Sequence, residues 1–569
     1  MSSSRSMSGT GSYDVIVVGA GAAGLSAAIF AAQSGASVLV LERSASIGGT
    51  SALSGGWMWL PGASRAEAAQ ADSREAAETY IRSIAGDRYR SDLVAAYLDG
   101  VPPVFEVLER SGLRAVHAET APDYSEHAPG AVSGGRAISA DAWSAHGLGR
   151  RRRDVRRPLR SMRVFGVVPQ LGDELNDFVQ ANRSLGSFAR VAVKIAAAAL
   201  QTICFGRPTR LTNGNSLVAQ LYRIALDAGA EFVLGARVEE LTATGARVDG
   251  VVAVRAGQSL RLSSRGGVIL ACGGISHNGD LAAKYFTHVG RGLAHCSVTT
   301  AEHDGEAVRL SAPFASRFAE DVEQPAAWAP VTAFGVEGRE VFPHLRSIGL
   351  PGLIAVNADG SRFTNEADSY HDFGQALIAD GEGRSAARAY LIADARTMNT
   401  YGIGYAKPLP IPRLAYYRNG YLVKGRTLDE IARKCGVDAE VLRRAVAEYN
   451  ADAEQGIDTR FGRGETFYNR FRGDKGHRPN PSLGPIGRAP YYASPITIGD
   501  LGSFVGLDVD RHARVLGESG EPVEGLYAAG TAAVSPFGGA YPGYGAMLGP
   551  AVVMGALAGE WAAATATGE

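Results

Sequence analysis

The chain has 569 residues, a formal net charge of −1 and 46% hydrophobic residues. It is too long for one ordinary hydrophobic core, so we expect two or more domains. A near-neutral charge excludes a general nucleic-acid-binding protein, which would carry a clear excess of basic residues.

The first predicted element is a strand over residues 13–18, YDVIVV, which is rich in β-branched residues, as a buried parallel strand requires. A glycine turn, a helix of small residues and a second strand that ends at Glu42 follow. This order places a GxGxxG motif where the backbone can approach a pyrophosphate and where Glu42 can accept a hydrogen bond from a ribose hydroxyl. The pattern predicts a dinucleotide site rather than a glycine-rich packing turn. The motif consists of Gly19, Ala20, Gly21, Ala22, Ala23 and Gly24.

Paired glycines follow the second strand in the stretch SIGGTSALSGG, residues 46–56. This stretch resembles the loops of the FAD-binding oxidoreductases of the fumarate reductase class, and the resemblance implies FAD rather than NAD. A covalent flavin in that class uses a histidine beside the position of Thr50. Because Gly49 stands there, we expect FAD to be bound non-covalently. The cofactor contacts implied in this region are Arg43, Gly49, Thr50, Ser54, Gly55 and Gly56.

Three later segments resemble the same class. A strand begins at Arg237-Val238, where the class contacts adenine, GVILACGGISHN (267–278) resembles its strand-to-glycine return, and GLYAAGT (525–531) resembles its last FAD strand. There is no second complete GxGxxG unit, so no nicotinamide domain is predicted, and we expect an external electron acceptor such as a quinone or a dye. The implied cofactor contacts are Val238, Ala271, Gly273 and Gly530.

These FAD signals fall in two blocks and imply an α/β fold. We expect a Rossmann-type FAD-binding domain built from both ends of the chain, with an inserted α+β catalytic domain that lays the substrate over the flavin. The predicted ranges are 12–296 and 490–569 for the two parts of the FAD-binding domain and 297–489 for the catalytic domain.

An arginine-rich segment, GRRRRDVRRPLRSMR (149–163), lies inside the first block. It is followed by SFARVAVKIAAAAL (187–200), which reads as a helix with sparse charge. The favoured interpretation is a solvated arginine surface beside a packed helix, and the alternative is a peripheral contact with an anionic membrane. No run of about twenty apolar residues is apparent, so no membrane-spanning helix is predicted.

The cysteines and the N-terminal residues bear on location. The polar start MSSSRSMSGTGS lacks the apolar core of a signal peptide. The cysteines show no CxxC pair and no metal-ligand spacing, which predicts no metal site and fits a reducing compartment. We therefore expect a cytoplasmic protein. The cysteines are Cys204, Cys272, Cys296 and Cys435.

The segment IAVNADGSRFTNEADSYHDF (354–373) resembles the VNxxGxRFxNE segment of the same flavoprotein class. Soluble fumarate reductases need arginine and histidine to clamp two carboxylates and an arginine to deliver the proton, whereas this chain has SYHDF (369–373) after NE. Residues 460–493, 499–516 and 541–551, which include NPSLGPI, APYYA, GDLG and YPGYG in this order, resemble the 3-ketosteroid Δ1-dehydrogenases. This resemblance covers nearly the whole chain from Tyr13. It implies FAD-dependent 1,2-dehydrogenation of a 3-ketosteroid, from a 4-en-3-one to a 1,4-dien-3-one, in steroid degradation.

The resemblance also implies site residues. The tyrosine hydroxyl and the second glycine N–H of YPGxG, which bind the 3-keto oxygen, map onto Tyr541 and Gly545, a pair of donors for a developing enolate. We expect Gly545 to leave room for the steroid ring and the helix from about Leu548 to aim its N–H groups at the flavin, so both also count as cofactor contacts. The base matches Tyr370, and a tyrosine that assists it matches Tyr124. A C2 proton would pass to Tyr370 and a C1 hydride to the flavin.

Alternatives remain open at this point. Each tyrosine could be a core aromatic residue, and departures at Phe504–Leu507 and at Tyr544 leave the substrate preference less defined than the reaction. Two other enzymes fit the pattern, a 3-keto-(5α)-steroid 4-dehydrogenase and an enoate reductase of fumarate type. A flavin-bearing membrane adaptor without turnover is a further alternative.

Overall fold

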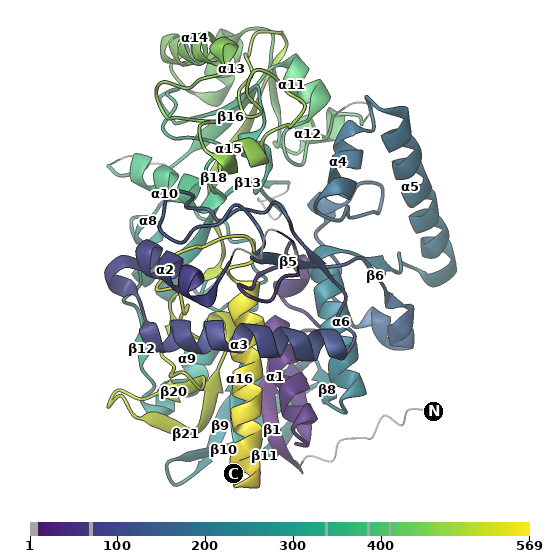
Figure 1. The fold of residues 1–569 in the computed structure, drawn as a ribbon, viewed down its shortest axis with the longest axis vertical. Helices are drawn as coiled ribbons and strands as arrows, with labels where there is room; N and C mark the ends of the chain where they lie inside the picture. Colours follow the sequence, from purple (N-terminus) through teal and green to yellow (C-terminus); the bar gives the residue numbers. More distant parts are fainter. Residues whose placement is uncertain are drawn as a thin grey trace.

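The computed structural model describes residues 10–65, 67, 72–335, 340–383, 387–408 and 411–568. Most of the polar N-terminal stretch, MSSSRSMSGTGS, therefore lies outside the described residues. This is the stretch on which the prediction of a cytoplasmic location partly rests. Two large sheets organise the chain: one lies with both chain ends in the lower part of Figure 1, and the other lies in the upper part.

The lower sheet has a parallel core in the order β21-β11-β1-β2-β8, with β20 antiparallel at one edge. Two further strands, β9 and β10, extend it as an antiparallel ribbon from β11. Residues 15–18 of β1 are almost fully buried, as the apolar YDVIVV run predicts. The strands are β1 (Thr10–Val18), β2 (Val38–Glu42), β8 (Glu231–Leu234), β9 (Ala236–Thr244), β10 (Arg247–Arg255), β11 (Gln258–Leu270), β20 (Arg514–Leu516) and β21 (Pro522–Ala528).

Helices from the two ends of the chain pack side by side on this sheet. These are α1 (Ala22–Gln33) and α16 (Leu548–Thr567), drawn in purple and yellow in Figure 1. A Cβ added at Gly555 of α16 would lie 2.4 Å from the carbonyl oxygen of Ala23, and one added at Gly559 would lie 2.3 Å from that of Ala27. Glycine at these two positions therefore permits the close approach of the helices. Helix α6 (Asn213–Asp227) packs beside α1, and α3 (Ser91–Arg110) packs across α16 in the view of Figure 1. The predicted domain built from both chain ends is confirmed at the level of the fold.

The upper sheet is antiparallel, in the order β14-β13-β18-β16-β15, and β17 pairs with β18. Its central strand β18 begins at Tyr491, so residues that we placed in the second FAD block contribute to the inserted sheet. The exact domain boundaries stay a prediction. The strands are β13 (Ala326–Phe334), β14 (Glu340–Pro343), β15 (Leu353–Val356), β16 (Ala389–Ala393), β17 (Val423–Gly425) and β18 (Tyr491–Ser503). The helices around it are α10 (Tyr370–Asp380), α11 (Ala395–Thr400), α12 (Leu414–Arg418), α13 (Leu428–Cys435), α14 (Ala439–Gln455) and α15 (Phe467–Arg472).

Smaller elements connect the two sheets. A three-stranded sheet in the order β3-β5-β4 lies between them. The strands are β3 (Trp57–Trp59), β4 (Ala115–His117), β5 (Ala137–Ala140), β6 (Trp143–Ser144), β7 (Arg210–Leu211), β12 (Phe318–Ala319) and β19 (Gly506–Leu507). The remaining helices are α2 (Arg74–Ala85), α4 (Asp173–Gln180), α5 (Leu185–Phe205), α7 (Gly279–Tyr285), α8 (Thr287–Gly290) and α9 (Glu306–Ser311).

Helix α5 differs from the sequence expectation. It starts before and ends after the predicted range 187–200, and at 21 residues it is long and apolar enough, by length and composition, to cross a membrane. Arg190 and Lys194 interrupt its apolar residues, which is why no such run was recognised in the sequence. It is also not packed into the core as favoured: it runs along one side of the molecule (Figure 1), with Leu185 and Ile203 among its exposed side chains.

Candidate active site

The GxGxxG turn connects β1 to α1, and its glycines permit close backbone contacts. Gly19 has φ +104°, and a Cβ there would lie 2.4 Å from the carbonyl oxygen of Ala271 at the end of β11. A Cβ at Gly24 would lie 2.0 Å from the carbonyl oxygen of Gly19. The helix N-cap, Gly21, has no side chain, and the first N–H groups of α1 have no acceptor within the helix. The turn is therefore an anion site of the kind that holds a pyrophosphate.

Glu42 ends β2 beside this turn. Its carboxylate oxygens accept hydrogen bonds from the N–H of Ala20 at 2.9 Å and from the N–H of Ser44 at 2.8 Å. Burial raises the pKa of Glu42 above its ordinary value. The carboxylate thus fixes the glycine turn, a role that the sequence did not predict, and it also lines the cavity in which a ribose would lie.

A cavity of about 1080 Å³ runs from the glycine turn to the predicted catalytic tyrosines. Its volume exceeds the usual 300–1,000 Å³ of a single ligand site, so a dinucleotide and a second molecule can share it. Among the predicted cofactor contacts, Gly24 alone does not line it and packs behind the turn instead. The open glycine turn and this elongated shape fit FAD. The predicted contacts on its wall are Gly19, Gly21, Ala22, Ala23, Glu42, Arg43, Gly49, Thr50, Ser54, Gly55, Gly56, Val238, Ala271, Gly273, Gly530, Gly545 and Leu548.

His303 lines the same cavity and was missed by the sequence reasoning. Its Nδ1 accepts a hydrogen bond from the N–H of Gly274 at 3.2 Å, so the proton of the neutral ring lies on Nε2, which donates to Thr50 Oγ1 at 3.0 Å. Burial lowers the pKa of His303 to about 4, which keeps the ring neutral near pH 7. The histidine belongs to no motif and meets Thr50 only through the fold. It therefore positions Thr50 at the cavity wall.

The three predicted tyrosines come together from distant parts of the chain. Tyr370 is the first residue of α10, Tyr541 precedes α16, and Tyr124 lies in the loop after β4. The Tyr124 hydroxyl donates to the Tyr370 hydroxyl at 3.0 Å, and that hydroxyl donates to Tyr541 at 2.7 Å. The rings of Tyr124 and Tyr541 are stacked, with centroids 5.5 Å apart. All three side chains are buried, and those of Tyr370 and Tyr541 line the cavity.

Burial is the largest cause of the pKa shifts of the tyrosines in this cluster. It raises the pKa of Tyr370 well above the ordinary value and that of Tyr541 to about 12. The hydrogen bond from Tyr124 acts on Tyr370 in the opposite direction, because it favours the phenolate. Near neutral pH the Tyr370 phenol is therefore protonated, and the hydrogen bond from Tyr124 lowers its pKa. That Tyr124 assists a catalytic base stays a prediction.

Gly545 has a free N–H and a constrained backbone. Its N–H donates to no other group in the described part of the chain, whereas its carbonyl oxygen accepts from Trp59 and Gly549. With φ +94°, a Cβ there would lie 2.4 Å from the N atom of Met58. The glycine is thus required by the approach of β3 as well as by any ring that enters the cavity, which corrects the reason given from the sequence.

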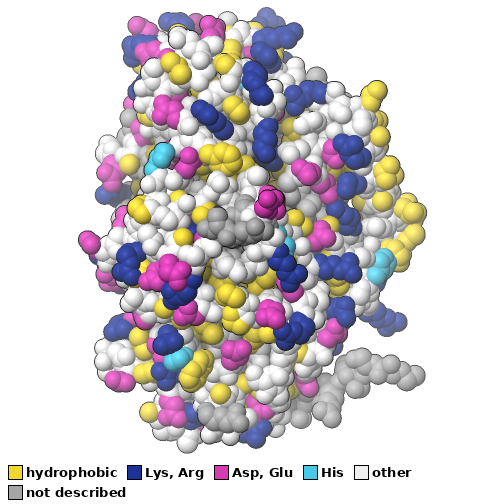
Figure 2. All heavy atoms as spheres, viewed as in Figure 1, with side chains coloured by type: hydrophobic (Ala, Val, Ile, Leu, Met, Phe, Trp, Pro, Cys, Tyr) yellow, Lys and Arg dark blue, Asp and Glu magenta, His cyan; other side chains and the backbone are white. Residues whose placement is uncertain are grey.

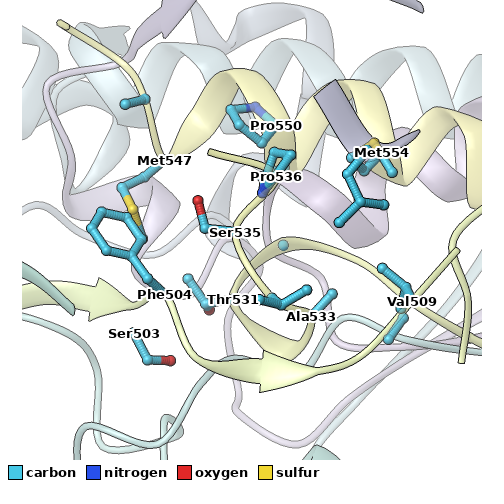
Figure 3. Close-up of a pocket in the computed structure, with 16 residues that line it drawn as sticks. Ser503, Phe504, Val509, Thr531, Ala533, Ser535, Pro536, Met547, Pro550 and Met554 are labelled. Atoms are coloured by element: carbon cyan, nitrogen blue, oxygen red, sulfur yellow. The ribbon is translucent and has the colours of Figure 1, made fainter. Parts of the chain in front are cut away.

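A second, much smaller cavity of about 30 Å³ lies behind the start of α16. Figure 3 shows Ser503, Phe504, Thr531 and Met547 around it. The Ser503 hydroxyl is buried without a hydrogen-bond partner, so a water molecule there would satisfy it. The cavity is too small for an organic ligand and supports the wall of the larger one.

Comparisons with known proteins agree with the cofactor site. A family model described as "FAD binding domain" matches residues 14–548. The chain is 46% identical over 553 residues to a 4-oxocyclohex-2-ene-1-carboxylate 5-dehydrogenase of Sinomonas cyclohexanicum, with 96% of this chain and 93% of that protein covered. It is 31% identical over 561 residues to a 3-oxosteroid 1-dehydrogenase of Mycobacterium tuberculosis, with 96% and 97% covered.

A solved structure shares the whole fold. It is a 3-ketosteroid Δ1-dehydrogenase from Sterolibacterium denitrificans in complex with 1,4-androstadiene-3,17-dione, with a TM-score of 0.89, 32% identity and 97% and 99% of the two chains covered. Identity to the dehydrogenase of a small keto acid is higher than to either steroid enzyme, so the steroid part of the sequence resemblance is not established. The chain belongs to the FAD-binding-domain family and is an FAD-dependent dehydrogenase related to the 3-ketosteroid dehydrogenases.

Proposed function

We propose that the protein dehydrogenates the carbon–carbon bond next to a ring ketone, as in the conversion of a cyclic enone to a cross-conjugated dienone. One observation carries this proposal: a buried chain of three hydrogen-bonded tyrosines ends at the wall of the FAD cavity, beside the free N–H of Gly545. A structural aromatic cluster would not need its hydroxyls to meet in this way.

The ketone oxygen is held by the Tyr541 hydroxyl and the Gly545 N–H. While Tyr370 is neutral, its hydroxyl donates to the Tyr541 oxygen, so the proton of Tyr541 is left to point toward a ligand that enters the cavity. Two donors at one oxygen stabilise the negative charge that develops as the α carbon loses its proton.

The proton of the α carbon passes to Tyr370. Tyr124 donates a hydrogen bond to this oxygen and so stabilises the phenolate that must form before the proton is taken. FAD, when bound along the glycine turn, would supply the acceptor for the hydride of the β carbon, so that the substrate would lose a proton and a hydride and be oxidised by two electrons. We propose that an external acceptor, a quinone or a dye in the assay, then reoxidises the protein.

Two substrate classes contain the same reacting fragment. The 3-ketosteroids are supported by the sequence resemblance and by the solved relative in complex with a steroid dione. The 4-oxocyclohexenecarboxylates are supported by the relative that is 46% identical. We rank a 4-dehydrogenation of 5α-steroids and a fumarate-type reduction lower, because Tyr370 rather than an arginine follows the NE segment.

The test is anaerobic mixing of the FAD-loaded protein with 4-oxocyclohex-2-ene-1-carboxylate or with 4-androstene-3,17-dione. We expect the flavin absorbance to bleach with at least one of them and the product to be the matching dienone or, for the keto acid, its aromatic tautomer 4-hydroxybenzoate. If the protein oxidises only 5α-saturated 3-ketosteroids, at C4–C5, the proposed reaction is wrong and the protein is a 4-dehydrogenase instead.

We also propose that the FAD is held without a covalent bond. Gly49 leaves no histidine at the position that the class uses, and the neutral ring of His303 donates to Thr50. Acid or heat should therefore release free FAD from the purified protein, as seen in the supernatant by its absorbance and mass. Flavin that stays with the denatured chain would overturn this proposal.

Finally, we propose that the protein works in the cytoplasm against an anionic membrane surface. Figure 2 shows apolar side chains along the edge where Figure 1 places α5, with basic side chains below them. The exposed fractions of Leu185 and Ile203 are 89% and 82%. The Arg152 guanidinium lies 5.5 Å from the ring of Phe205, which joins the arginine-rich segment 149–163 to the end of α5. Apolar side chains beside arginines suit anionic lipid.

A further inference from the structure

The side chain of Arg472 carries a positive charge in the core of the protein without a counterion. It is the last residue of α15 and is only 2% exposed. Its Nη1 donates to the Tyr468 hydroxyl at 3.0 Å, whereas Nε and Nη2 are buried and have no hydrogen-bond partner among the described residues. Among the described residues no carboxylate lies within ion-pair distance of it. A buried charge in this condition is costly unless a ligand pairs with it.

The nearest acidic groups are engaged elsewhere. The charge of Arg472 opposes the effect of burial on the pKa of Asp368 and Asp372, so both lie within its electrostatic range. Asp368 accepts from Asn469 at 2.9 Å, and Asp372 accepts from Ser369 at 2.7 Å. Neither carboxylate occupies the free edge of the guanidinium.

The residue that carries this buried free edge belongs to the wall of the FAD and substrate cavity. Arg472 lines the cavity, and so does Arg346, whose Nη2 donates to Asn176 Oδ1 at 3.0 Å. Desolvation is the main cause that lowers the pKa of Arg346, and the charge of Arg472 acts in the same direction, whereas Tyr544 and Asp474 act in the opposite one. Two arginine residues, both positively charged, therefore line the same cavity.

The same space is adjacent to the tyrosine cluster. The ring of Tyr468, which Arg472 contacts, has its centroid 5.1 Å from that of Tyr124. Tyr544, the residue that departs from the pattern of the steroid enzymes, lies 4.9 Å from Tyr124 and 6.2 Å from Phe471, both between ring centroids. The cations therefore lie one layer of aromatic side chains away from the oxygen site formed by Tyr541 and Gly545.

We propose that the substrate is a keto acid whose carboxylate binds to Arg472, with Arg346 as the outer cation, while its ketone oxygen binds to Tyr541 and Gly545. This inference rests on the proposed ketone dehydrogenation and names its substrate class. A guanidinium with two free nitrogens on one side matches a carboxylate, whereas a steroid dione offers it no charge. A six-membered ring with the carboxylate opposite the ketone has both groups that the site requires.

The test compares a charged and an uncharged substrate of the same shape, 4-oxocyclohex-2-ene-1-carboxylate and its methyl ester. We expect Arg472→Met to lower kcat/KM for the carboxylate by about 10- to 100-fold, the usual worth of hydrogen bonds to a charged group, and to change it far less for the ester. Arg472→Lys should recover part of the loss because it keeps the charge. Arg470→Met is the matched control: Arg470 lies on the same helix, is exposed and does not line the cavity.

A binding measurement separates recognition from an effect on the tyrosines. Titration calorimetry of the FAD-loaded protein with 4-hydroxybenzoate, which places a phenol oxygen opposite a carboxylate, should show a Kd that rises about 10- to 100-fold in Arg472→Met. Methyl 4-hydroxybenzoate should bind the variant and the wild type with similar affinity. If Arg472 only stabilised phenolates of the tyrosine cluster, both compounds and both substrates would be affected equally, which would overturn the inference.

Failure of the inference differs from failure of the proposed function. If wild-type protein dehydrogenates the ester as efficiently as the carboxylate, or turns over the steroid dione better than both, the keto acid is wrong and the ketone chemistry stands. If wild-type protein dehydrogenates none of these ketones, the proposed function itself fails.

Discussion

At the scale of single residues, the proposed mechanism assigns the binding of the ketone to Tyr541 and the removal of the proton to Tyr370. Tyr541→Phe keeps the ring but removes one of the two donors at the oxygen, so we expect kcat to fall about 10²- to 10³-fold. Tyr370→Phe should be at least as harmful because it removes the proton acceptor, and Tyr124→Phe should be milder because it only assists that acceptor. Anaerobic flavin bleaching measures each rate. FAD content should stay normal in all three variants, and near wild-type bleaching by Tyr370→Phe would exclude it as the base.

The pH dependence follows from the ionisation of Tyr370. Burial raises its pKa, and the reactive form is the phenolate, so kcat/KM should rise with pH through the alkaline range. The hydrogen bond from Tyr124 lowers that pKa, so Tyr124→Phe should shift the rising limb to higher pH. A profile measured with a stable ketone substrate checks this. A limb that stays in place in the variant would mean that Tyr124 does not tune the base.

At the scale of the elements, each part of the site depends on where a helix starts. Helix α1 starts at the glycine turn, α10 begins at Tyr370, the proposed base, and α16 begins just after Tyr541 and Gly545, the proposed oxygen site. The small residues of α1 and α16 let these helices touch, which brings both ends of the chain to one cavity.

Helix α5 is the element whose role is most open to experiment. In sedimentation with vesicles of phosphatidylcholine and phosphatidylglycerol, the protein should bind at low salt and be released as salt screens the arginines. Leu200 and Ile203 are 62% and 82% exposed, so changing both to Glu should abolish binding without harm to the core. Ile457→Glu, at an exposed apolar residue outside α5, is the control. Wild-type protein that stays in the supernatant at low salt would leave α5 as a solvated surface.

At the scale of the whole molecule, local patterns predicted the cofactor region well. The strand, glycine turn and helix at residues 13–33 are contiguous in sequence, so their geometry follows from local chemistry. His303 could not be predicted, because its partner Thr50 is more than two hundred residues away in the chain. Arg472 could not be predicted, because what distinguishes it is burial without a carboxylate partner among the described residues. The family resemblance implied the tyrosines but pointed to a steroid. The size and charge of the substrate depend on the cavity wall, where Arg472 and Tyr544 lie.

The central claim is that a ring ketone loses an α proton to Tyr370 and a β hydride to the flavin. The most direct measurement is anaerobic stopped-flow bleaching with 4-oxocyclohex-2-ene-1-carboxylate that carries deuterium at C6, the β carbon, compared with unlabelled substrate and with Tyr370→Phe. We predict that the label slows the bleaching and that 4-hydroxybenzoate forms. The Tyr370→Phe variant should show neither the bleaching nor the product. Bleaching that is insensitive to the label and proceeds equally in Tyr370→Phe would contradict this mechanism.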